Sequence, residues 1–192
     1  MRRRSKGPGS LIAIGVALAL AVGAGWFLAR RSHEQGPALT SAVPLLQSEA
    51  ERRRVISHLY FGDLQGRFLT SEQRAVDRSD SAADYARQLI NLLVEGPKEG
   101  GSRTLPETAR VRALFVSGDG VAYVDFADNA FDQHPGGVGS ELITIYSVVN
   151  TLVLNIEDVR SVKLLIGGRE AATLAGHVDL APVYKAAMLW VR

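Results

Sequence analysis

The sequence contains no cysteine. This absence excludes a disulfide framework, a thiolate metal site, a cysteine nucleophile and lipid attachment through a cysteine. The four histidines and the acidic residues are the remaining candidates for acid–base chemistry or metal binding.

Acidic residues are missing from the first 33 positions, where positive charge is concentrated. Six of the 22 Lys and Arg residues lie within the first 31 positions, which leaves 16 in the remainder against 20 Asp and Glu. The formal net charge of +2 therefore reflects the N-terminal segment, and the rest of the chain carries −4. A mildly acidic remainder gives no electrostatic reason to bind nucleic acid.

Charged residues are also missing from residues 10–29, SLIAIGVALALAVGAGWFLA, which follow a basic segment at residues 1–9. A helix of this length extends about 30 Å, the thickness of a bilayer core. More cations precede the run than follow it, which favours a cytoplasmic N-terminus and an extracytoplasmic remainder. We predict a cytoplasmic stub at 1–9 and an uncleaved, single-pass transmembrane helix at 10–29. A cleaved signal peptide is the alternative, but the run is long for one and lacks a convincing small-residue cleavage site.

The segment after the apolar run is predicted to be a linker. Residues 30–53 include two Pro and many small or polar residues, so they are expected to lift a globular domain off the membrane. We place that domain at residues 54–182 and a C-terminal tail at 183–192. A domain of about 130 residues is large enough to bury its own core.

Five strands are predicted from alternating or continuous apolar runs. Residues 54–62 and 68–76 are rich in residues that favour strands. Residues 109–127 read as a β-hairpin, because two apolar runs flank Ser-Gly-Asp-Gly and Asp-Gly suits a tight turn. Residues 158–168 resemble a buried strand that ends in Gly-Gly.

Two helices are predicted from apolar residues at helical spacing. Ser81 and Asp84 resemble a capping box at the start of the first helix. Its pattern stops at Gly96 and Pro97, which are typical of a helix end. The second helix is expected over about 140–154.

The predicted order of elements is β-β-α-β-β-α-β. This order indicates an α+β fold in which one small β-sheet carries both helices on one face, preceded by the N-terminal transmembrane helix. The residues expected in its core are Leu89, Phe115, Val124, Ile145, Leu152 and Leu165.

The stretch DQHPGGVGSELITI at residues 132–145 is rich in glycine directly before the second helix. Backbone N–H groups at a helix start attract anions, but the stretch lacks the Lys of a P-loop and the Gly spacing of a dinucleotide motif. Glu141 would also place negative charge where a phosphate would lie. We therefore interpret the stretch as a turn, with Ser140 as the N-cap and Glu141 at the positive end of the helix dipole.

Two histidines lie near acidic residues in the sequence. His134 could approach Asp132 and Glu141, and His177 could approach Asp179. Such pairs could form a metal site or acid–base machinery if they converged. No established catalytic or metal-binding motif accompanies them, so turn and capping roles are favoured.

Four segments, in order, resemble the GerMN domain of the GerM-like sporulation and spore germination family: NLLVEGP, VRALFVSGDGVAYVDFADNAF, SELITIYSVVNTL and VKLLIGGREAATLAGHVDL. The resemblance covers about residues 54–182. It implies an extracytoplasmic α+β assembly module without a known reaction, similar to the ring-building domains of secretion and sporulation machines. The residues that match as structural signatures are Gly96, Pro97, Asp119, Gly120, Asp125, Asn150, Thr151, Gly176, His177 and Asp179.

The sequence departs from the spore-former pattern in having one such domain rather than two and a predicted membrane helix rather than a lipidated cysteine. An envelope role outside sporulation is therefore equally compatible with it. We predict a non-catalytic envelope module that forms homo-oligomers or binds other envelope proteins, with no catalytic, cofactor-binding or metal-binding residue. The alternative is an envelope domain that binds ligands or carries out metal-assisted hydrolysis of cell-wall material.

Overall fold

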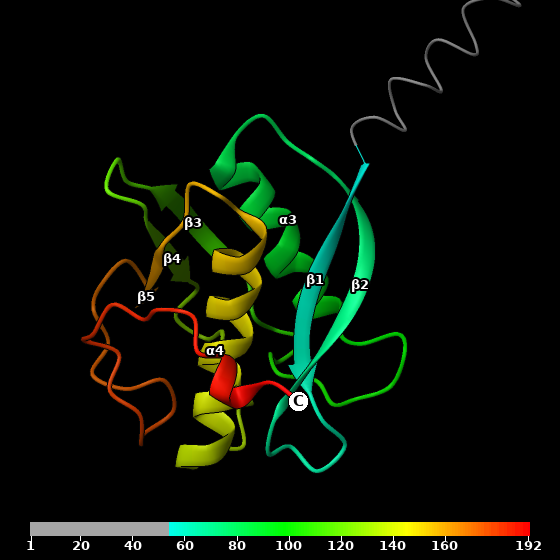
Figure 1. The fold of residues 1–192 in the computed structure, drawn as a ribbon. Coiled ribbons are helices and arrows are strands. Elements are labelled where there is room, and N and C mark those ends of the chain that lie inside the picture. The colour runs from blue at the N-terminus through cyan, green and yellow to red at the C-terminus, as the bar shows by residue number, and fades with distance from the viewer. Residues whose placement is uncertain (1–53) are drawn as a thin grey trace, which may run out of the picture. The chain divides into compact units, whose positions relative to one another are not determined.

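The computed structural model describes residues 54–192, and the predicted stub, transmembrane helix and linker at 1–53 lie outside the described residues. Figure 1 shows the arrangement of the elements. Their bounds are β1 (Arg54–Gly62), β2 (Leu69–Asp77), α3 (Ala82–Glu95), β3 (Val111–Val116), β4 (Val121–Phe126), α4 (Val138–Asn155), β5 (Ser161–Ile166) and a 3-10 turn, η1 (Met188–Trp190). The predicted β-β-α-β-β-α-β order and the α+β class are confirmed.

The strands form two sheets, so the prediction of a single sheet with both helices on one face is wrong. Strands β1 and β2 pair antiparallel, and β3, β4 and β5 form a second sheet in that order. In the second sheet β4 pairs antiparallel with β3 and parallel with β5. Helix α3 contacts β1 and β3, and α4 contacts β1 and β5, so the helices lie between the two sheets (Figure 1).

Side chains of α4 occupy the edge of β1 that faces away from β2. The His58 N–H donates to Asn155 Oδ1 at 2.8 Å, and Asn155 Nδ2 donates to the His58 carbonyl at 2.7 Å. The Tyr60 N–H donates to Thr151 Oγ1 at 3.1 Å, and the Ser147 hydroxyl donates to the Tyr60 carbonyl at 2.5 Å. Because residues four apart lie on one face of a helix, Ser147, Thr151 and Asn155 form a polar row along β1. This row keeps the two sheets apart.

The helix starts differ from each other in how they are capped. The Asp84 N–H donates to Ser81 Oγ at 3.2 Å, which confirms the predicted cap of α3. Helix α4 begins two residues earlier than predicted, with Gly137 at the N-cap and a φ of +89°. The prediction of Ser140 as N-cap is therefore wrong, and its hydroxyl donates back to the Gly136 carbonyl from inside the first turn.

The core between the sheets contains four of the six residues predicted for it. Leu89, Val124, Ile145 and Leu152 have no exposed surface. Leu165 is only half-buried, because its neighbour Leu164 takes the inward position on β5.

Phe115 contradicts the predicted core, since 61% of its surface is exposed. The pairing of β3 with β4 shifts between Val111 and Ala113, which marks a β-bulge. A bulge changes which residues of a strand face each side. Leu114 and Val116 therefore pack against the core, and Phe115 points to the outer face.

Helix α4 is the central helix of this core. Within residues 54–192 it is the one helix with the length and hydropathy of a membrane span, but 56% of that window is buried inside the domain. Its apolar character is therefore explained by its place between the two sheets.

Residues 183–192, predicted as a tail, contact the domain along their length. Tyr184 exchanges two backbone hydrogen bonds of 2.8 Å with Val162 of β5. Trp190 stacks on Tyr146 of α4 with ring centroids 5.7 Å apart. The Arg192 N–H donates to the Leu69 carbonyl at 2.9 Å. The segment therefore closes over α4 and links β5 to β2.

Candidate functional site

The carboxylate of Glu141 lies in the first turn of α4 and has no exposed surface. Its Oε1 is 2.8 Å from His177 Nδ1. Its Oε2 accepts the backbone N–H groups of His177 at 3.2 Å and Val178 at 2.8 Å. One buried carboxylate thus holds the loop that carries the Gly-His-Val-Asp segment of the sequence.

The hydrogen bonds keep Glu141 ionised despite its burial. Burial by itself raises the pKa of this carboxyl, but the bonds from the Val178 N–H and the His177 ring outweigh it and lower the pKa below 4.5. Because an ionised carboxylate offers only acceptors and lies 2.8 Å away, His177 Nδ1 carries the hydrogen in this pair, and it therefore cannot accept the Gly137 N–H that lies 3.1 Å from it. The side chain of His177 remains 50% exposed.

His134 lies beside this pair, with both ring nitrogens in use. The Gly136 N–H donates to Nδ1 at 3.0 Å, and Nε2 is 2.9 Å from Thr144 Oγ1. Thr144 donates its own hydrogen to the Thr104 carbonyl at 2.6 Å, so Nε2 must donate to Thr144. Burial lowers the pKa of His134 below 6.5, more than the nearby Glu141 charge raises it. His134 is therefore a neutral structural residue without a free nitrogen for a metal or a substrate proton.

The histidine–acid pairs that the sequence left possible do not form as hydrogen-bonded pairs, and a different pair, His177 with Glu141, does. His177 bonds Glu141, whereas Asp179 Oδ1 accepts the Ala181 N–H at 2.8 Å in a turn. His134 is hydrogen-bonded to Thr144 rather than to Asp132. Over the described part of the chain, no group of three or more His, Cys, Asp or Glu side chains is placed to hold a metal ion.

The signature residues of the β3–β4 hairpin hold turns. Asp119 accepts a bond from the Ser117 hydroxyl, and Gly120 has a φ of +85°. Asp125 is buried on β4, where Oδ1 accepts the Gly168 N–H at 2.8 Å and Oδ2 is 2.5 Å from Arg112. Gly168 has a φ of +79°, a backbone conformation that favours glycine, and a Cβ there would also displace the Arg112 guanidinium.

The other signature residues also have structural partners. Arg74 donates to the Gly96 carbonyl at 2.6 Å beside Pro97, at the end of α3. The Gly176 N–H donates to Thr173 Oγ1 at 3.0 Å, before the His177 segment. Thr151 belongs to the polar row described above.

Asn150 is buried on α4 and holds the C-terminal segment. Its Oδ1 accepts the Ala187 N–H at 2.9 Å, and its Nδ2 donates to the Ala187 carbonyl at 3.3 Å. Asn150→Ala should cost about 1–3 kcal/mol of stability and increase hydrogen exchange in residues 184–192, because it removes the two hydrogen bonds that hold the Ala187 backbone against α4. Asn91→Ala, at an exposed position on α3, is the matched control and should change neither. Unchanged exchange in the C-terminal segment of Asn150→Ala would contradict this role.

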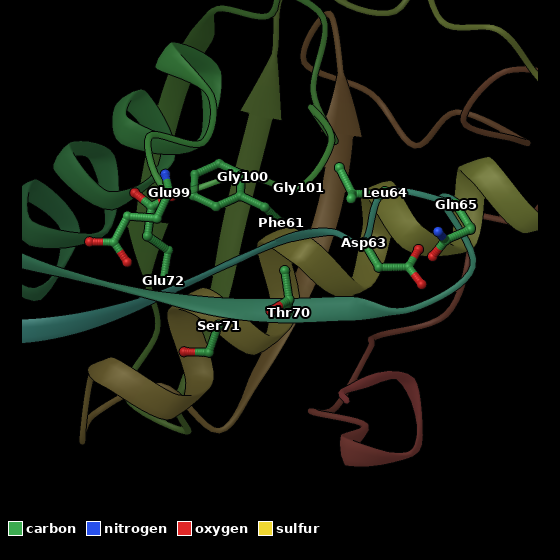
Figure 2. A pocket seen from close by; sticks show the side chains of 10 residues that line it. All are labelled: Phe61, Asp63, Leu64, Gln65, Thr70, Ser71, Glu72, Glu99, Gly100 and Gly101. Carbon is green, nitrogen blue, oxygen red and sulfur yellow. The ribbon is translucent and has the colours of Figure 1, made fainter.

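An acidic hollow lies between the β1–β2 turn and residues 99–101, with a volume of about 360 Å³. Figure 2 shows Glu72 and Glu99 together at one end and Asp63 nearer the other. Glu72 is buried, pairs with Arg74 at 2.6 Å, and accepts the Lys98 N–H at 2.8 Å. Asp63 Oδ1 accepts the Arg67 N–H at 2.7 Å. Since these two carboxylates are bonded to the protein itself, the hollow offers little for catalysis.

An exposed aromatic pair marks the outer face of the three-stranded sheet. Phe115 and Tyr123 face each other across β3 and β4, with ring centroids 6.2 Å apart and exposed fractions of 61% and 37%. Ala113 of β3 is also exposed beside them. Sequence reasoning placed Phe115 in the core and so missed this face.

Comparison with known proteins agrees with the fold. A family model described as Germane, sporulation and spore germination, matches residues 58–172. The first GerMN domain of the Bacillus subtilis sporulation protein GerM is 22% identical, with a TM-score of 0.55 over 70% of this chain and 98% of that one. The tandem GerMN structure of GerM is 21% identical, with a TM-score of 0.56 over 69% of this chain and 46% of that one. A candidate lipoprotein of Clostridium perfringens is 20% identical, with a TM-score of 0.50 over 69% and 87% of the two chains. Among curated proteins none matches the chain.

Proposed function

The chain belongs to the Germane family of sporulation and spore germination, and on that premise we propose that it is a non-catalytic assembly module of the bacterial envelope. In this proposal residues 10–29 anchor the protein in the cell membrane, with the N-terminus in the cytoplasm. The domain lies on the extracytoplasmic side and binds a second copy of itself or another envelope protein.

The exposed face formed by Phe115, Tyr123 and Ala113 is the observation that supports assembly most directly. Aromatic residues are enriched at protein interfaces, and neighbouring exposed apolar side chains mark binding surfaces better than scattered ones do. The groups able to do chemistry, in contrast, are bonded within the fold: Glu141 and His134 each hold loops in place.

The test of assembly is the mass of the protein at several concentrations. Light scattering behind size exclusion of the full chain in detergent micelles, together with chemical cross-linking in membranes, should reveal a defined oligomer or a specific envelope partner. A monomer at every concentration, without a cross-linked protein in membranes, would remove the support for assembly.

The Glu141–His177 pair favours one alternative, a domain that binds or hydrolyses cell-wall material with a metal ion. A carboxylate that orients a histidine through Nδ1 is common at metal and acid–base sites, and the His177 ring is half exposed. This alternative requires metal in the purified protein or binding to isolated cell wall, and either property should be lost in His177→Ala. Metal analysis and a cell-wall sedimentation assay distinguish it from assembly.

A further inference from the structure

Three of the four strand edges in the domain are covered or polar. The edge of β1 is bonded to α4 as described, and Gly62 at its end exchanges two hydrogen bonds with Ser102. The edge of β5 is paired at Val162 with Tyr184. Strand β2 is paired with residue 191 at Leu69, and its exposed side chains beyond that point are mostly polar. Charged and polar side chains are a common means of preventing edge-to-edge association.

The edge of β3 differs, because it is apolar and open. Phe115 is paired with Tyr123, and the Ser117 N–H donates to the Val121 carbonyl at 3.0 Å. Since bonding directions alternate along an antiparallel strand, the backbone N–H and C=O groups of Leu114 and Val116 point away from β4. Within residues 54–192, no backbone or side-chain group forms a hydrogen bond with them at this edge.

We propose that β3 of a second copy of this chain pairs antiparallel with β3 at this edge, with a two-fold axis at Phe115. The inference rests on the proposed assembly function and gives it a surface and a partner. The pairing would join the two three-stranded sheets into one sheet of six strands.

The register favours a second copy because the edge is complementary to itself. A two-fold axis at Phe115 sets Leu114 of each copy opposite Val116 of the other. In each of these two pairs the backbone N–H of either residue donates to the backbone carbonyl of the other. The two Phe115 rings then meet on the outer face, flanked by Tyr123 from each copy.

The bulge sets the length of the contact. Beyond it the Val111 carbonyl already accepts a bond from Arg87 Nη1 at 3.0 Å. The paired region is therefore short, and association should depend on concentration. Two anchors in one membrane would raise the local concentration of the domain.

A single introduced cysteine tests the register, because the chain has no thiol of its own. Phe115→Cys would be opposite itself in a pair without hydrogen bonds, where Cβ atoms lie about 4.5 Å apart, at the upper end of the disulfide range. Full-length Phe115→Cys in membranes should form a disulfide-linked dimer on mild oxidation. Leu189→Cys, which replaces a residue that is 92% exposed away from β3, is the matched control and should give at least tenfold less dimer.

A second variant tests the same axis without a thiol. Phe115→Lys places two positive charges on the axis and should shift the wild-type oligomer to monomer, with an unchanged circular dichroism spectrum because residue 115 is exposed. If wild-type protein associates but Phe115→Cys gives no more dimer than Leu189→Cys, or gives a mixed disulfide with another protein, pairing of β3 with a second copy is wrong while assembly stands. If wild-type protein neither associates nor cross-links, both proposals fail.

Discussion

Leu152→Ala is expected to lower the free energy of unfolding by about 2–5 kcal/mol. Leu152 has no exposed surface, and it lies on α4 within the core cluster that both sheets enclose. Truncation to Ala removes apolar contact and leaves a cavity that packed neighbours fill only in part. Urea unfolding of residues 50–192, followed by circular dichroism, measures the change.

Leu189→Ala is the matched control, because the same chemical change at a residue that is 92% exposed should alter stability by less than ~0.5 kcal/mol. A loss below ~1 kcal/mol for Leu152→Ala would show that this face of α4 does not pack against the core. A comparable loss in both variants would indicate an effect on the unfolded chain rather than on packing.

Local signals in the sequence predict the local elements of this fold. The cap at Ser81, the helix end at Gly96 and the hairpin around Asp119 each depend on residues within a few positions, and the structure contains all three. The strand at 54–62 is also correct. What was wrong is the relation between elements, because a polar row on α4 takes the place of a neighbouring strand beside β1. In the sequence, Ser147, Thr151 and Asn155 look the same whether they face solvent or a strand edge.

The outer face of the three-stranded sheet was missed for a different reason. Val111, Ala113 and Phe115 occupy every second position, so a regular strand would place their side chains on the same face of the sheet. The bulge between Val111 and Ala113 interrupts that pattern, and nothing in the composition of the strand marks it. The one extra residue in the bulge places the Phe115 side chain on the surface instead of in the expected core.

The site near α4 was predicted as a region but not as a set of contacts. Glu141 was expected only to favour the positive end of the helix dipole, but its buried carboxylate also bonds a loop 36 residues later. His134 bonds Thr144 across the first turns of the helix. Proximity in sequence suggested Asp132 and Asp179 as partners, whereas folding selects partners from distant segments.

Glu141→Gln is expected to cost about 1.5–3 kcal/mol of stability at pH 7, the range for hydrogen bonds to a charged group. Gln has the same size and still accepts one set of bonds, but it loses the negative charge that attracts the His177 ring and the Val178 N–H. The same urea measurement applies. Glu157→Gln, at an exposed position just after α4, is the matched control and should have little effect.

The pH dependence separates the charge from the shape of this side chain. The pKa of Glu141 is lower in the folded protein than the ordinary 4.5, so below about pH 4.5 the unfolded chain takes up a proton first. The stability that this carboxylate contributes is therefore complete above pH 4.5 and is lost as the pH falls through the folded pKa. The difference between wild-type and Glu141→Gln should shrink over that range.

Other groups with lowered pKa values enter the comparison in two ways. The pKa of Glu72 is lowered by groups that do not include Glu141, so its contribution to acid sensitivity largely cancels in the difference. The pKa of His134 is also lowered by burial, but the Glu141 charge raises it, so the loss of that charge in Glu141→Gln makes the variant still less stable in acid through His134. A difference that stays constant from pH 7 to pH 3 would mean that Glu141 holds the Gly-His-Val loop by its size alone. A difference that narrows below pH 4.5 would mean that the ionised form of Glu141 is what stabilises the Gly-His-Val loop at the start of α4.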